Sequence, residues 1–337
     1  MKTRPNTLPK EVYGILVLVT ILLVVTGFSL TAGAATLSIG EMLQGLFGSG
    51  DELLEAIVWE LRLPRMLLGV LVGATLGLAG AALQAMFKNP LAEPGVIGVS
   101  SAAALGAVVV LYFGLAGFAD ATLPLAAMAM ALLAMALLVM VVLWDVSVLT
   151  LILAGVALNS FAAALTALAL NLSPNPFAYN DIMFWLMGSL SNRSMDDLVL
   201  ILPFVLGGWG LMLWASVPLR TTVLSDDAAH SLGVNLNFIK ILVITGVALS
   251  VGASVAVTGV IGFVGLIAPH MVRPIFGHDP VKVMVPSALA GAILLLSADV
   301  MIRLLPNGEN LRLGVVTALL GAPFFVYYLM ATRKAMR

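Results

Sequence analysis

The chain has 337 residues, of which 61% are apolar and 10% are charged. Soluble domains usually carry about 45–50% apolar and about 25% charged residues, so this composition, with a mean hydropathy of +1.11, predicts a polytopic membrane protein. The net charge of -1, without a long charged tract, argues against nucleic-acid binding, and the lack of cysteine excludes disulfides and thiolate metal sites.

Long apolar segments divide the chain into candidate membrane spans. A spanning helix needs about 20 mostly apolar residues, and runs without alternation are not typical of barrel strands. Clear candidates are 12–33, 61–85, 95–114, 121–143, 149–170, 198–217, 283–305 and 311–331. Residues 237–269 are too many for one span, and Thr258, Gly259 and Gly262 indicate a break with a short second span after it. We therefore predict an all-α polytopic membrane protein with ten transmembrane helices in a single transmembrane domain, 1–337.

The first span also has features of a secretory signal peptide. Lys2, Arg4 and Lys10 precede it, and residues 32–34 (Ala-Gly-Ala) resemble a cleavage site. Cleavage would leave nine spans and place the mature N-terminus outside. We favour an uncleaved span because the apolar run is long for a signal peptide.

Charge in the short loops sets the expected orientation. With the N-terminus inside, every lysine falls on the same side, so both termini are expected in the cytoplasm. Five arginines fall on the opposite side: Arg62, Arg65, Arg193, Arg303 and Arg312. They either anchor to headgroups and local carboxylates, as Arg303 would one helical turn from Asp299, or receive acidic side chains from an extracytoplasmic partner. The residues alone leave both interpretations open.

The predicted spans contain almost no ionisable residue, which argues against a proton-coupled carrier. Nothing matches the P-loop pattern GxxxxGK[ST], so this chain is not expected to bind ATP in that way. His230, His270 and His278 do not have a metal-ligand spacing on one helix, and no nucleophile–base pairing is recognisable. We expect neither an enzyme nor a resident cofactor or metal, and the energy for transport must come from a partner.

Small residues line the second span. Gly69, Gly73, Gly77 and Gly80 form a seam that lets another helix approach closely. The seam indicates either ordinary tight packing or a central helix surrounded by the others.

A short polar helix is expected on the cytoplasmic loop, at about 225–233. Ser225 can cap it, Asp226 and Asp227 lie in its first turn, His230 lies in its last turn, and Gly233 ends it. It either joins two spans or fits a groove on a cytoplasmic partner.

Three blocks of sequence closely resemble one known family. They are RLPR at 62–65 followed by QAMFKNPLAEPG at 84–95, then GVIGFVGLIAPHMVR at 259–273, and GVVTALLGAPFF at 314–325. In this order they resemble the FecCD permeases of ABC importers for iron–siderophores, haem and cobalamin, and the likeness extends from about residue 55 to about residue 330.

The resemblance implies a type II importer of the bacterial inner membrane. Two copies of the permease would enclose one path, with two cytoplasmic ATPases that bind ATP and Mg and a periplasmic or lipid-anchored substrate-binding protein. By family position, Arg62, Arg65 and Arg303 look like the arginines that meet glutamates of the binding protein. Arg193 and Arg312 gain no such support and are interpreted as anchors; many relatives have proline where this chain has Arg312.

Two cytoplasmic regions also resemble functional parts of the family. The predicted polar helix is similar to the coupling helix that sits on the ATPase. Its residues are Ser225, Asp226, Asp227, Ala228, His230, Ser231, Leu232 and Gly233. The start of the fifth span resembles the region of the inner gate, which could close by dewetting. Its residues are Ser147, Val148, Leu149 and Thr150.

These expectations combine into one predicted function. The chain is expected to be the permease subunit of an ATP-driven importer that moves an iron chelate, either a ferric siderophore or haem, by alternating access. Cobalamin remains an alternative substrate. A secondary carrier working alone is disfavoured, because the spans contain few charges and the sequence has no obvious inverted repeat. A membrane scaffold is disfavoured because it would need neither the glycine seam nor the polar helix.

Overall fold

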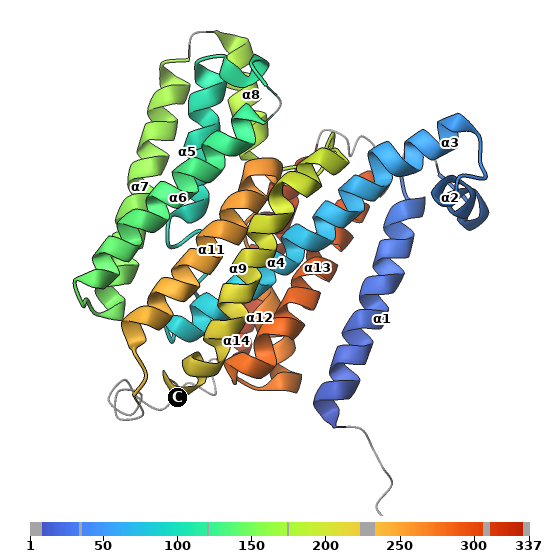
Figure 1. The fold of residues 1–337 in the computed structure, drawn as a ribbon. Coiled ribbons are helices and arrows are strands. Elements are labelled where there is room, and N and C mark those ends of the chain that lie inside the picture. Colours follow the sequence, from blue (N-terminus) through green and yellow to red (C-terminus); the bar gives the residue numbers. More distant parts are fainter. Residues whose placement is uncertain are drawn as a thin grey trace, which may run out of the picture.

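The computed structural model describes residues 9–33, 36–119, 121–173, 175–222, 233–305 and 311–332. Its long helices form one bundle, with α1 at one edge and α5 to α8 at the other (Figure 1). The helices that match the ten predicted spans are α1 Lys10–Thr31, α4 Leu63–Met86, α5 Val99–Tyr112, α6 Thr122–Leu143, α7 Val148–Asn171, α9 Met195–Thr222, α11 Leu236–Thr258, α12 Val264–Phe276, α13 Pro280–Leu304 and α14 Leu313–Thr332. In the described part, seven spans are long and apolar enough to cross a membrane, and α5, α12 and α14 are shorter apolar helices.

Short helices that the hydrophobic pattern did not predict join the spans on the side assigned to the exterior. They are α2 Ile39–Leu46, α3 Glu52–Ala56, the π-helix η1 Ile57–Arg62, the 3-10 helix η2 Leu115–Gly117 and α8 Pro176–Leu186. A capping box starts α2, because Ser38 Oγ accepts from the Glu41 N–H while the Glu41 carboxylate accepts from the Ser38 N–H. This hydrogen bonding lowers the pKa of Glu41.

The central helix of the bundle is α4, which packs against α13, α12, α9 and α11. Its small residues explain how the neighbours come so close. A Cβ on Gly77 would overlap the backbone carbonyl of Ser287 in α13, and one on Gly80 would overlap that of Gly265 in α12. Gly73 meets Gly291 in the same way, whereas Gly69 faces the side chains of Leu296 and Leu190. Three glycines of the seam thus pack tightly against the backbones of α12 and α13, and α4 has helices α9, α11, α12 and α13 around it.

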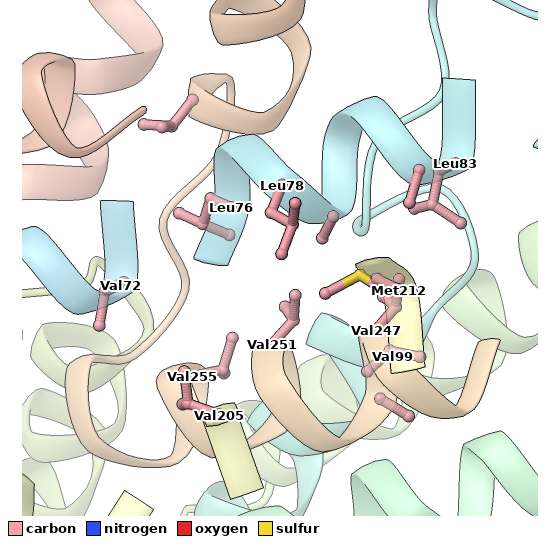
Figure 2. Packing of buried hydrophobic residues seen from close by; sticks show 14 of the residues in the cluster. Val72, Leu76, Leu78, Leu83, Val99, Val205, Met212, Val247, Val251 and Val255 are labelled. Atoms are coloured by element: carbon pink, nitrogen blue, oxygen red, sulfur yellow. The ribbon is translucent and has the colours of Figure 1, made fainter. Parts of the chain in front are cut away.

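Apolar side chains fill the space where α4 meets α9 and α11. Figure 2 shows this core, with the labelled residues Val72, Leu76 and Leu78 from α4, Val205 and Met212 from α9, and Val247, Val251 and Val255 from α11. The indole N–H of Trp209 in α9 donates to Thr75 Oγ1 of α4 at 3.0 Å. Side-chain packing thus holds the three helices together, and one part-buried hydrogen bond joins α4 to α9.

The predicted break in the long apolar segment is present. Helix α11 ends at Thr258, and Gly259 has φ +70°. A Cβ on Gly259 would overlap the carbonyl of Trp185, so glycine is required there for both conformation and space. The chain then passes through Phe263, at φ +68°, and begins α12 at Val264.

Candidate functional site

The three arginines predicted to dock a binding protein lie together at the end of the bundle that the charge pattern assigns to the exterior. Arg65 of α4 forms a fork on the buried carboxylate of Asp299 in α13. Its Nε lies 3.0 Å from Oδ1 and 3.1 Å from Oδ2, and its Nη2 lies 2.8 Å from Oδ1. Charge-assisted, paired hydrogen bonds of this kind are among the strongest in proteins. This pair ties the central helix to α13.

Arg303 and Arg62 bind the end of α1. Arg303 Nη1 donates to the carbonyls of Ser29 and Ala32, both at 2.8 Å. Arg62 Nη1 donates to the carbonyl of Leu30 at 2.6 Å. The last carbonyls of a helix have no partner within the helix and carry partial negative charge, so the two guanidinium groups satisfy and neutralise the C-terminus of α1.

All three arginines therefore have partners inside the protein. Arg62 is 7% exposed, and the side chains of Arg303 and Arg65 are 9% and 21% exposed. The predicted pair of Asp299 and Arg303 is confirmed, with 3.1 Å between Oδ2 and Nε. The contacts with α1 could not be predicted, because every residue has a backbone carbonyl and the residue types do not indicate which carbonyls an arginine binds. The docking role itself stays a prediction.

Arg312 has a different environment. Its guanidinium carbon lies 4.8 Å from the ring centroid of Phe184 in α8, in a cation–π contact. Two backbone hydrogen bonds hold this junction, from Leu313 N–H to the carbonyl of Gly188 at 3.0 Å and from Gly314 N–H to that of Met187 at 3.1 Å. The aromatic partner was not expected from the sequence, since α8 itself was not predicted.

The gate residues form the first turn of α7. Ser147 Oγ accepts from the Thr150 N–H at 3.2 Å and so caps the helix. Val148 packs against the hydrophobic core, whereas Leu149 is 66% exposed. An apolar side chain is thus available at the predicted position, and its role as a gate stays a prediction.

The predicted coupling helix, from Ser225 to Leu232, lies outside the described residues. Gly233 is described, has φ +76° and lies just before the N-cap of α11. There Asn235 Oδ1 accepts from the Phe238 N–H at 3.0 Å. The side chain of His270, the one histidine within a described span, bonds the carbonyl of Leu266 through Nδ1 at 2.7 Å. Within the described ranges, no group of three or more His, Asp or Glu side chains could hold a metal ion.

Comparison with known proteins identifies the family. The model of the FecCD transport family matches residues 21–331. The chain belongs to the FecCD transport family. It is 37% identical to the vitamin B12 import system permease BtuC of Salmonella paratyphi A, over 96% of this chain and 97% of that protein. It is also 37% identical to the Fe(3+)-citrate import system permease YfmD of Bacillus subtilis, over 89% of each chain.

A solved structure of similar fold supports the same assignment. The inward-facing structure of a metal-chelate type ABC transporter matches with a TM-score of 0.83 and 31% identity, over 95% of this chain and 99% of that chain. This FecCD protein is therefore a multi-pass permease subunit of a type II ABC importer. In such importers ATP is hydrolysed on separate subunits, so the permease is not itself an enzyme, and it works with ATPase and substrate-binding partners.

Proposed function

We propose that this permease imports an iron chelate, a ferric siderophore or haem, from the periplasm to the cytoplasm by alternating access. Two copies form the path in the bacterial inner membrane, with both termini in the cytoplasm, and two ATPase subunits bind ATP and Mg. The observation that carries the proposal is the family match over nearly the whole chain, together with the ten spans. The relative that imports Fe(3+)-citrate favours an iron compound, and the equally similar vitamin B12 permease makes cobalamin the second candidate.

The scarcity of charge in the spans supports an external energy source. The buried carboxylate of Asp299 forms ion pairs with Arg65 and Arg303, and these pairs lie near the outer ends of their helices. A proton-coupled carrier needs ionisable groups that change state near the midplane. ATP bound to the partner subunits must therefore favour one access state over the other, because a ligand shifts an equilibrium only by its differential affinity.

We place the partner contacts where the family resemblance puts them. The binding protein docks over Arg62, Arg65 and Arg303, and Arg65, the most exposed of the three, is the best placed to share its guanidinium with an incoming carboxylate. The ATPase receives the helix at about 225–233. Residues 147–150 close the cytoplasmic end of the path, with Leu149 from each copy meeting the other.

The first test is native mass spectrometry of the tagged chain, purified gently from its own membranes. We expect two copies of the permease with two copies of an ATPase. A chain that purifies alone, under conditions that keep a known ABC importer assembled, would contradict the proposal and favour a secondary carrier.

The second test concerns the substrate. The cognate binding protein is loaded with a ferric siderophore, haem or cobalamin, and ATP-dependent uptake is measured in proteoliposomes containing the assembled importer. Uptake of the ferric siderophore or of haem supports the proposal. Uptake of cobalamin alone would mean that the substrate is cobalamin, while ATP-driven import by alternating access would still hold.

A further inference from the structure

The arginines on the outer side fall into two groups that differ in their hydrogen bonding. Arg62, Arg65 and Arg303 bind carbonyls or the Asp299 carboxylate. By contrast, the guanidinium of Arg312 takes part in no hydrogen bond or ion pair with the described residues, and its contact there is with the face of Phe184. A cation stacked on an aromatic ring is held in place while its N–H donors stay available.

Unpaired donors accumulate in the same part of the molecule. In the described ranges, the indole nitrogen of Trp185 and Nε of Arg312 are buried and have no hydrogen-bond partner. Trp185 adjoins Phe184 in α8, the ring on which Arg312 stacks. Leaving such donors unpaired is unfavourable. An acceptor from outside the chain would satisfy the donors of the Arg312 guanidinium.

The backbone beneath Arg312 is tightly built. A Cβ on Gly188 would overlap the carbonyl of Val260, and one on Gly314 would overlap that of Met187. The Ser189 N–H donates to the carbonyl of Thr258 at 2.7 Å. Three segments distant in the sequence thus meet with no space for side chains between them, which fixes the position of Arg312 and Phe184.

The placement of α8 relates this junction to the path. Helix α7 begins at the predicted inner gate and ends at Asn171, and α8 follows it directly on the outer side. Figure 1 shows α8 at the far end of α7 from the gate. The proposed function has the first turn of α7 close the cytoplasmic end of the path. With α7 running along that path from its cytoplasmic end, Phe184 and Arg312 lie at the outer mouth.

We infer that Arg312, stacked on Phe184, is a specificity-determining residue that binds a carboxylate of an anionic substrate chelate at the outer mouth. The planar guanidinium suits a carboxylate, and its positive charge disfavours a cationic substrate. The inference rests on the proposed function and narrows its substrate class to chelates that carry free carboxylate groups.

The test measures the binding of citrate, a small polycarboxylate chelator, to the purified permease in nanodiscs without binding protein. The permease is used with its ATPase where the two copurify and alone otherwise. Isothermal titration compares citrate with its uncharged triethyl ester. We expect saturable binding of citrate and none of the ester. Arg312→Gln, which removes the charge at similar length, should weaken citrate binding about tenfold or more, and Arg312→Lys should fall between Gln and wild type.

Arg193→Gln is the matched control, because it removes another outer guanidinium that has no ring contact. It should change citrate binding less than twofold. Thermal unfolding of each variant checks that the fold is intact, and Phe184→Leu, which removes the ring face, should weaken binding in the same direction as Arg312→Gln.

Three outcomes would overturn the inference: no saturable citrate binding by wild type, equal binding by Arg312→Gln, or binding of the ester as strong as that of citrate. A further arm measures capture of the binding protein. If Arg312→Gln weakens that capture and leaves citrate binding unchanged, the carboxylate belongs to the binding protein and not to the substrate. An ATPase-containing complex that hydrolyses ATP but binds no citrate refutes this inference alone, whereas the absence of any ATPase refutes the proposed function.

Discussion

Helices α4 and α7 have the same length and nearly the same apolar character, yet they occupy opposite environments. The most apolar windows of their spans both have a mean hydropathy of 2.1, but 83% of the α4 window is buried against 17% of the α7 window. Lipid tails are as apolar as leucine, so hydropathy does not distinguish a helix that faces protein from one that faces lipid or another subunit. The small residues make the difference, because α4 places Gly73, Gly77 and Gly80 against the backbones of α12 and α13.

The largest effect is expected at Gly77, where a Cβ would overlap the backbone of α13. Gly77→Leu would drive a side chain into the carbonyl of Ser287 and separate α4 from α13. We expect almost no monodisperse permease in size-exclusion chromatography. Gly27→Leu in α1 is the control, since no atom lies within 4 Å of a Cβ built there. Equal yields from the two variants would show that the seam is not what makes α4 central.

The next largest effect should come from the carboxylate that joins α4 to α13. Asp299→Ala leaves Arg65 and Arg303 without their shared counterion in a buried site. Removing one partner of a buried ion pair costs about 3–5 kcal/mol, which thermal unfolding in detergent would detect. Asp299→Asn should lose less, because it keeps an acceptor. Lys282→Ala, which removes an exposed pair with Glu11, should cost far less stability, and a loss as large as that of Asp299→Ala would contradict this ranking.

On α7, a substitution should affect assembly rather than the fold of one copy. Phe161 is exposed in the single chain, and the proposed pairing would cover it. Phe161→Ala should weaken the permease pair by about 2 kcal/mol, as aromatic residues at an interface centre do, without lowering the thermal stability of the dissociated chain. Native mass spectrometry over a dilution series measures this, and an unchanged ratio of pairs to single chains would indicate that this face of α7 meets lipid.

The smallest effect is expected at the start of α7. Ser147→Ala removes the cap on the Thr150 N–H and should destabilise the helix end by about 1 kcal/mol. Hydrogen exchange should become faster at Thr150 and stay unchanged at Phe238, which Asn235 caps at the start of α11. Equal exchange at Thr150 in both proteins would mean that packing of Val148, and not the cap, holds this turn.

Much of the fold followed from local chemistry. Seven of the spans could be predicted because each is a long apolar run, and the break after Thr258 because glycine permits the backbone conformation found there. The start of α5 was placed too early, at residue 95, because the turns that precede Val99 are themselves apolar. Helix α8 was missed since it is too short for a span and lies between two others.

The candidate site was less accessible to prediction. The spacing of Asp299 and Arg303 indicated their pairing, because residues four apart lie on one helix face. Nothing in the sequence could indicate that Arg62 and Arg303 bind carbonyls of α1 or that Arg312 stacks on Phe184, since these contacts join segments far apart along the chain. The resemblance located the outer arginines, and the geometry separated those with internal partners from Arg312.

The short helix α12 has a consequence for how the protein is made. Its 13 residues span roughly 20 Å at 1.5 Å per residue, less than the hydrocarbon core of about 30 Å. The non-helical residues before it leave backbone groups that lipid cannot satisfy, so they must be enclosed by protein. During synthesis α12 is therefore a poor independent substrate for the insertion machinery. It should enter the membrane together with α11 or α13. It should reach its final position when Gly265 packs against Gly80 of α4, which is inserted earlier.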